Sequence, residues 1–288
     1  MAKVLSNRFD GHETRRGPDQ VIVEEPLAIH LDGVLVATTM RTPGHDFELA
    51  AGFLHGDGLL AGAPILTCRY CGTEPEPSAP GVGADGAVVE GAPAALRTKR
   101  VRAVDTGFNV VSVDTGGRAP APTPRLTTAT AACGLCGSAS LDELADRLEP
   151  LPPTPAFLLD LLAAMPERVV GEQALFAVTG AVHAAAAFDR SGEPLVVRED
   201  IGRHNAVDKV VGRLLLDGRL PATGLGLFVS GRASFEMVQK AWAAGFAAVV
   251  AVSGPSSLAV ETARAAGLTL AGFARNATLN IYSPERLP

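Results

Sequence analysis

The fold class can be predicted from residues 225–274, LGLFVSGRASFEMVQKAWAAGFAAVVAVSGPSSLAVETARAAGLTLAGFA. Short apolar runs typical of buried strands alternate in it with amphipathic stretches of helical spacing. We expect strands over 225–229, 247–252 and 268–274 and helices over 233–243 and 257–266. Because the β-α-β connections are short, the three strands should be parallel and covered by helices.

The flanking sequence extends this sheet and adds a second unit. Residues 182–188 and 194–198 are expected to pair as a hairpin, which makes the C-terminal half a mixed sheet. Near the N-terminus, Asp32-Gly33 lies between two strand-like runs and predicts another hairpin. The other expected elements are helices over 46–54, 141–148, 155–165 and 202–216 and strands over 97–104, 108–114 and 174–178. The first 18 residues are polar and unpatterned, which is typical of a mobile terminus.

The fold class is therefore α/β, in an α+β arrangement of two domains. We expect a small N-terminal mixed domain over 19–126 and a larger mixed-sheet domain over 141–288 with helices on both faces. Between them, residues 127–140 are expected to form a mobile Cys-x-x-Cys loop. Small hydroxyl residues lead into Cys-Gly-Leu-Cys-Gly there, which suits an exposed flexible segment better than a strand.

Composition excludes several classes of protein. The 288 residues carry a net charge of −6 with a pI of about 5.5, which argues against binding nucleic acid by phosphate neutralisation. No apolar run approaches the roughly 18 residues of a membrane span. Arg15-Arg16 is followed by Gly17-Pro18 rather than by an apolar stretch, so it is no export signal. We expect a cytoplasmic protein without nucleic-acid or membrane partners.

Polar loops follow all three expected parallel strands. Ligands of open α/β sheets bind outside the carboxyl ends of such strands. Two of the loops open helices, whose free N–H groups favour anions, and two bring an arginine suited to phosphate. The alternative is a purely structural role, because Ser and Gly are favoured in helix caps and turns. The candidate phosphate or nucleotide ligands at these strand ends are Ser230, Arg232, Ser253, Ala274, Arg275, Asn276, Ala277 and Thr278.

The segment 198–209, REDIGRHNAVDK, is the most charge-dense of this half. If it is helical, His204 has Asp200 and Asp208 as i,i+4 neighbours. The neighbouring carboxylates would shift the pKa of such a histidine, which suits a proton carrier or a base that orients a ligand. The pattern is equally typical of a solvated helix start whose charged side chains pair with one another. His183 lies in an Ala-rich run, which favours a structural histidine.

The four cysteines form two pairs, Cys68/Cys71 and Cys133/Cys136. A disulfide scaffold is not expected in an unexported chain of this length. A four-thiolate zinc site is possible, although the 61 intervening residues exceed the usual spacing of about 15–20. Deaminase chemistry is excluded because no His-x-Glu is present. A thioredoxin-like oxidoreductase carries this motif at the start of a helix that follows a strand, and the residues before Cys133 fit that setting poorly. A thiolate on a Gly-lined loop can instead carry a persulfide.

Several blocks resemble one family almost letter for letter. They are RTPGHDFELAAGFL (41–54), CGLCG (133–137), TGAVHAAAAFD (179–189), VREDIGRHNAVDKVVG (197–212), SGRASFEMVQKA (230–241) and SSLAVE (256–261). Together they resemble the FdhD family of formate dehydrogenase accessory sulfurtransferases, from about Glu24 to Tyr282. The 199–209 and 230–240 blocks are the most specific.

The resemblance implies a concrete function. Such proteins take sulfur from a cysteine desulfurase as a persulfide and pass it to the molybdenum cofactor, bis-molybdopterin guanine dinucleotide, of formate dehydrogenase. By position, Cys133 resembles the persulfide-bearing cysteine and Cys136 its partner, while residues 273–278 fall on the cofactor-binding stretch with its GDP-like moiety. The resemblance also implies a homodimer, contact with the formate dehydrogenase catalytic subunit, no catalytic metal, and a cytidine-deaminase-like C-terminal domain.

Two departures from the family pattern matter. Asn276-Ala277-Thr278 replaces the usual Gly-x-Arg turn, which removes one charge-assisted contact of roughly 1.5–3 kcal/mol unless Arg275 and Arg232 compensate. Cys68 and Cys71 are not shared by all members, so an accessory thiol pair, a metal tether and no function all stay open. A rival function is a non-enzymatic cofactor chaperone whose cysteines hold structural zinc.

Overall fold

The computed structural model describes residues 1–71, 108–122, 148–284 and 287. The expected loop over 127–140, with Cys133 and Cys136, lies outside these residues. So do the strand expected over 97–104 and nearly all of the helix expected over 141–148.

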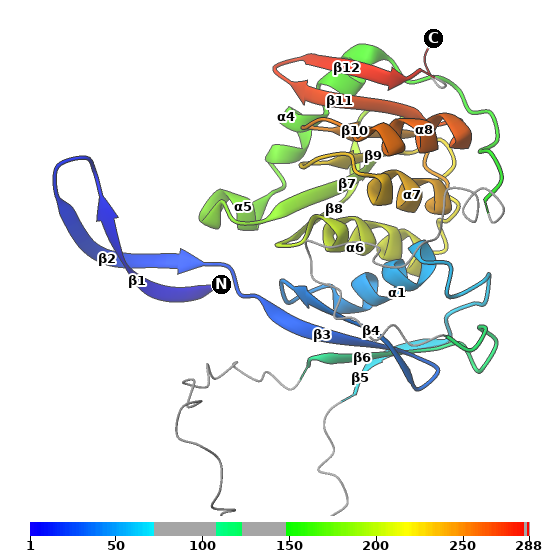
Figure 1. The fold of residues 1–288 in the computed structure, drawn as a ribbon, viewed down its shortest axis with the longest axis horizontal. Coiled ribbons are helices and arrows are strands. Elements are labelled where there is room, and N and C mark those ends of the chain that lie inside the picture. Colours follow the sequence, from blue (N-terminus) through cyan, green and yellow to red (C-terminus); the bar gives the residue numbers. More distant parts are fainter. Residues whose placement is uncertain (72–107, 123–147, 285–286, 288) are drawn as a thin grey trace, which may run out of the picture.

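A six-stranded mixed sheet forms the larger part of the molecule (Figure 1). Its strands are β7 (His183–Phe188), β8 (Pro194–Asp200), β9 (Gly226–Val229), β10 (Ala248–Ala251), β11 (Thr269–Arg275) and β12 (Thr278–Ser283), in the order β12-β11-β10-β9-β7-β8. The three predicted parallel strands, β9, β10 and β11, are confirmed as parallel neighbours. The predicted β7–β8 hairpin is also confirmed, and β7 pairs antiparallel with β9. Strand β12, which was not predicted, returns antiparallel along β11.

Helices cover both faces of this sheet, as predicted. They are α6 (Arg203–Leu216), α7 (Phe235–Ala244) and α8 (Ser257–Ala266) on one face and α3 (Leu159–Ala163) and α4 (Met165–Val170) on the other. Every residue of β9 and β10 is buried, because strands covered on both sides need apolar residues at every position. The mixed α/β class is thus confirmed, and the cytidine-deaminase-like detail stays a prediction.

The N-terminal unit is a four-stranded sheet covered by one helix. Its strands are β3 (Glu25–Leu31), β4 (Val34–Arg41), β5 (Thr67–Tyr70) and β6 (Val110–Asp114), in the order β4-β3-β6-β5, with α1 (Asp46–Gly56) packed against them. The predicted Asp32-Gly33 turn is confirmed, with φ of 47° and 85°. Leu27, Ile29 and Leu31 alternate along β3 and bury one face of it.

The two units are joined through a close crossing of α1 and α6. A Cβ on Gly52 would lie 1.9 Å from the carbonyl oxygen of Asp208, and one on Gly212 would lie 1.8 Å from that of Glu48. The two helix backbones therefore touch directly, which only glycine permits. In Figure 1 this crossing lies between the four-stranded sheet and the helices of the six-stranded one.

Two predicted segments differ from the structure. Residues 174–178 are not a strand but part of helix α5 (Ala174–Thr179). The carboxylate of Glu199 accepts hydrogen bonds of 2.8 Å from the amides of both Leu175 and Phe176, which stabilises the helix start. A five-residue apolar run shows no periodicity that could separate the two structures.

The first residues also differ, since β1 (Ala2–Phe9) and β2 (Thr14–Val21) form an antiparallel hairpin. It projects from the body of the molecule (Figure 1). Its residues are almost all exposed, so backbone pairing holds it without an apolar pattern that sequence analysis could detect.

Candidate functional site

The polar loops after β9, β10 and β11 lie side by side, as predicted. The amide of Ser253 donates to the carbonyl of Gly231 at 3.1 Å, and the amide of Phe273 donates to that of Ser253 at 3.2 Å. Helices α7 and α8 begin directly after the first two loops. Their N-terminal ends therefore face the same edge of the sheet, where their dipoles favour an anion.

The third loop is a hairpin turn rather than a helix start. Asn276 and Ala277 have φ of 51° and 56° and connect β11 to β12. Arg275, directly before the turn, is exposed. Phe273 is 41% exposed and has a φ of 55°, an uncommon conformation for an aromatic residue. A Cβ on Gly254 would lie 2.8 Å from the Phe273 ring, so the ring lies directly on that loop.

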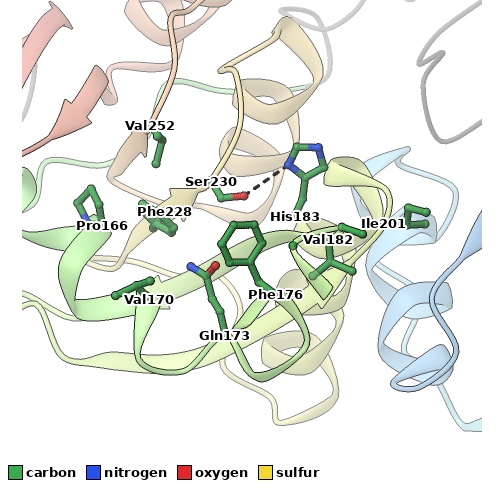
Figure 2. A pocket seen from close by; sticks show the side chains of 12 residues that line it. Pro166, Val170, Gln173, Phe176, Val182, His183, Ile201, Phe228, Ser230 and Val252 are labelled. Carbon is green, nitrogen blue, oxygen red and sulfur yellow. Dashed lines mark hydrogen bonds between the residues drawn. The ribbon is translucent and has the colours of Figure 1, made fainter. Parts of the chain in front are cut away.

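A cavity of about 540 Å³ opens beside the first loop. Figure 2 shows its largely apolar lining, with Phe176 and Phe228 in the middle and the His183 and Ser230 side chains facing each other. The lining residues are Pro166, Val170, Gln173, Phe176, Gly180, Ala181, Val182, His183, Ile201, Phe228, Ser230 and Val252. The volume suffices for a planar heterocycle, with polar groups at one side to orient it.

His183 is a site residue that the sequence analysis missed. Its Nδ1 lies 3.5 Å from Ser230 Oγ, and the same hydroxyl accepts a 2.9 Å hydrogen bond from the Ala184 amide. Burial and the positive charges of Arg203, His204 and Arg232 lower the pKa of His183. The residue comes to this edge because β7 runs antiparallel to β9, so that the start of β7 lies beside the end of β9.

His204 has an ion-pair partner that was not predicted, while Asp208 is its helical neighbour as expected and Asp200 is not. Strand β8 continues to Asp200 and α6 begins at Arg203, so Asp200 is not helical. His204 Nε2 instead forms an ion pair with Glu236 in the first turn of α7. Burial raises the pKa of Glu236, but the hydrogen bond and charge of His204 outweigh it and lower that pKa. His204 is not among the residues that line the cavity.

Arg203 was not predicted as a site residue either. It begins α6 beside Arg232, and burial together with the charge of Arg232 lowers its pKa. Glu236 contributes a nearby opposing charge. Sequence reasoning missed Arg203 because its distance from Arg232 depends on how α6 packs against the β9 loop.

The sequence comparison gives a consistent family. The model of the FdhD/NarQ family matches residues 22–287. The chain belongs to the FdhD/NarQ family. Relatives named "Sulfur carrier protein FdhD" include one from Streptomyces coelicolor, 45% identical over 98% of this chain and 92% of its own length. Another, from Anaeromyxobacter dehalogenans strain 2CP-1, is 45% identical over 93% of this chain and 88% of its own length.

A solved structure supports the fold of this FdhD/NarQ chain. The crystal structure of a candidate formate dehydrogenase accessory protein from Desulfotalea psychrophila superimposes with a TM-score of 0.72. The match covers 100% of this chain and 99% of that one, at 23% sequence identity. At that identity the likeness shows a shared fold.

Cys68 of this FdhD/NarQ chain does not have the properties of a sulfur carrier. Cys68 packs against the core of the four-stranded sheet, and burial raises the pKa of its thiol to about 11. At neutral pH such a thiol is protonated, whereas the thiolate is the nucleophile and the metal ligand. Across the described residues no cluster of His, Cys, Asp and Glu could hold a metal ion.

In that same part of the chain no helix has the length and apolarity to cross a membrane.

Proposed function

We propose that this chain is a sulfurtransferase that carries a persulfide sulfur from a cysteine desulfurase to bis-molybdopterin guanine dinucleotide. The loaded cofactor would serve the catalytic subunit of formate dehydrogenase. The observation that carries the proposal is the similarity, at 44–45% identity over 98% of the chain, to relatives named as sulfur carriers. The Cys133/Cys136 pair supplies the residue type that this chemistry needs. The protein would act in the cytoplasm as a homodimer.

The transfer can be written with atoms and electrons balanced. The Cys133 thiolate attacks the terminal sulfur of the donor persulfide, so that one S–S bond breaks and another forms. The Cys136 thiolate then attacks the inner sulfur, which releases hydrosulfide and leaves a Cys133–Cys136 disulfide. Hydrosulfide and one proton replace an oxo ligand of molybdenum by sulfide and release water. A dithiol reductant restores the two thiols.

The strand-end loops would bind the cargo. Ser230, Arg232, Ser253 and Arg275 are proposed to contact its phosphates, because hydroxyls and arginines on adjacent loops suit bidentate anion binding. The exposed Phe273 ring offers a stacking surface for a base. His204, held by its ion pair with Glu236, is proposed to lie in the same crevice. We place the rest of the cofactor contact on 274–278.

The decisive experiment is intact mass after incubation with a cysteine desulfurase and L-cysteine. Wild type should gain one or more sulfur atoms, reversed by reductant, and Cys133→Ala should gain none. Cys68→Ala is the matched control and should load like wild type, because its thiol is half-buried and protonated. Sulfur transfer that persists in Cys133→Ala would contradict the assignment.

The alternative is a non-enzymatic cofactor chaperone with structural zinc on its cysteines. It predicts about one zinc per chain and no reactive thiol, whereas the sulfur-carrier proposal predicts at least two reactive thiols. Metal content and thiol titration on the same sample therefore separate the two functions. Failure of mass gain with an active desulfurase would favour the chaperone.

A further inference from the structure

The hairpin of β1 and β2 lies exposed over its whole length. None of the residues in either strand is buried, and in Figure 1 the hairpin projects away from the rest of the molecule. A single two-stranded hairpin is at best marginally stable in water, because it has no second layer to pack against. Residues 2–21 also precede the part of the chain that the family model matches. The hairpin therefore needs a covering surface that the described remainder of its own chain does not provide.

The two faces of the hairpin differ in chemistry. Successive side chains of a strand point to opposite faces, so Leu5 and Phe9 share one face. They are 65% and 67% exposed, and Pro18 lies opposite Leu5 on that same face. The other face places Arg8 directly opposite Arg15, which favours water on that side. The face with Leu5, Phe9 and Pro18, which we call the arm face, is therefore the one to be covered.

A second apolar surface lies on α4 and α5. The sequence of α5, ALFAVT, is almost entirely apolar, yet the helix buries none of its residues. A helix that is apolar on all sides is normally buried. Phe176 and Val178 of α5 are 43% and 50% exposed, and Val170 at the end of α4 is 55% exposed. We call these three residues the α4–α5 patch, and exposed apolar surface of this kind marks an interaction site.

The arm face and the α4–α5 patch are placed so that two copies of the chain can cover both. Strand β2 lies beside α5 within one chain, so the base of the hairpin and the patch are neighbours. A twofold axis next to this contact carries each hairpin onto the helices of the other copy, which gives a self-complementary interface. Residues 2–21 together with the patch come close to the roughly 20–30 residues a side of a stable protein–protein interface.

Charge also favours a second copy as the partner. The net charge of the chain is −6, yet residues 1–21 carry four basic and three acidic side chains. On the arm face, Lys3 and Arg16 flank the apolar residues. On α4, Glu167 is exposed, and the neighbouring Arg168 is already bound to a backbone carbonyl. Lys3 and Arg16 of one copy can therefore pair with Glu167 of the other.

We propose that the β1–β2 hairpin is an arm that packs its arm face on the α4–α5 patch of a second copy of this chain. Val170 and Phe176 also line the cavity of about 540 Å³ (Figure 2). The hairpin of one copy would therefore lie at the mouth of the other copy's cavity and complete its wall. This arrangement rests on the proposed function, because it supplies the interface of the proposed homodimer, and it makes each cavity depend on both copies.

The test is the mass of the full chain in solution, measured by analytical ultracentrifugation over a range of concentrations. Wild type should be a dimer at micromolar concentration. Replacing Leu5 and Phe9 together by Ser should weaken dimerisation at least about tenfold, because the interface loses two apolar side chains from each arm. Replacing Val34 and Leu35 together by Ser is the matched control, since these two exposed apolar residues lie at the β3–β4 turn, and it should dimerise like wild type. A monomeric wild type, or an unchanged dissociation constant in the Leu5/Phe9 variant, would overturn the proposal.

Mixing two defective variants separates this arrangement from others. Val170→Lys places a cation against the basic arm, so it should weaken dimerisation as well. The Leu5/Phe9 variant keeps an intact patch and Val170→Lys keeps an intact arm, so their mixture should form heterodimers through one intact contact, more readily than either variant dimerises alone. A mixture without this gain would overturn the proposal, because it would show that the arm packs on its own chain or that two arms pair with each other.

Persulfide loading keeps the arm separate from the proposed chemistry. Both variants should gain sulfur like wild type in the mass experiment, because neither changes Cys133 or Cys136. A chain that dimerises through the arm as expected but never gains sulfur would contradict only the proposed sulfurtransferase activity.

Discussion

Charged side chains gather in two regions of this molecule, and they are paired with opposite charges in only one of them. At the junction of the N-terminal unit with α6 and α7, each buried cation has a carboxylate partner. Lys240 lies 2.6 Å from Asp208, Lys209 lies 2.7 Å from Asp200, and Arg41 lies 2.9 Å from Asp46. At the strand-end loops, Arg203 and Arg232 lie close together while the nearest carboxylates bind other groups.

The difference separates a structural role from a ligand-binding one. Two oppositely charged groups lose free energy of hydration when they are buried, and their mutual attraction offsets most of that loss. Because either partner alone would be unstable, the pair fixes how two elements pack. Unpaired like charges reduce the stability of the free protein and recover that free energy only when an anion binds. The balanced junction therefore holds the two units together, and the unbalanced strand-end loops are where we expect the cargo.

Lys209→Met tests the comparison with the largest expected effect. It leaves the fully buried Asp200 without its cation, so the free energy of unfolding should fall by about 3–5 kcal/mol in urea titration. Arg232→Gln should cost less than about 0.5 kcal/mol, because it removes an unpaired exposed charge. The double variant Lys209→Met with Asp200→Asn should recover part of the loss. An equal loss in Arg232→Gln would show that the charge at the strand-end loops is structural.

The pH dependence of stability sharpens the same contrast. The pKa of Glu48 is lowered to about 2: burial raises it, but bonds and charges from Arg198 and His45 outweigh burial. A carboxyl with a depressed folded pKa stabilises fully above its unfolded pKa, near 4.5, and loses that contribution as the pH falls toward 2. Glu48→Gln should therefore lower the melting temperature at pH 7 and flatten its decline below pH 4.5. If the melting temperature of Glu48→Gln declined below pH 4.5 as steeply as that of wild type, a stabilising Glu48–Arg198 pair would be contradicted.

The balance of charge was not visible in the sequence, although much of the fold was. The 225–274 pattern predicted three parallel strands and two helices, and the β-α-β rule placed their loops together. Strand β12 and helix α5 were missed because short segments carry too little periodicity. His183 and Arg203 were missed because their place in the site depends on antiparallel pairing and helix packing across the chain. Spacing placed Asp200 on the same helix as His204, which is wrong because α6 begins only at Arg203, and it could not reveal Glu236 on α7.

The smallest expected effect distinguishes two serines in equivalent positions. Ser256 accepts from the Ala259 amide and caps α8, so Ser256→Ala should lower the free energy of unfolding by about 1 kcal/mol. Ser234 forms no such bond before α7, so Ser234→Ala should leave the ligand-free stability within about 0.5 kcal/mol of wild type. If Ser234→Ala destabilised the protein as Ser256→Ala does, the Ser234 hydroxyl would cap α7 in solution, which would contradict the difference between the two helix starts.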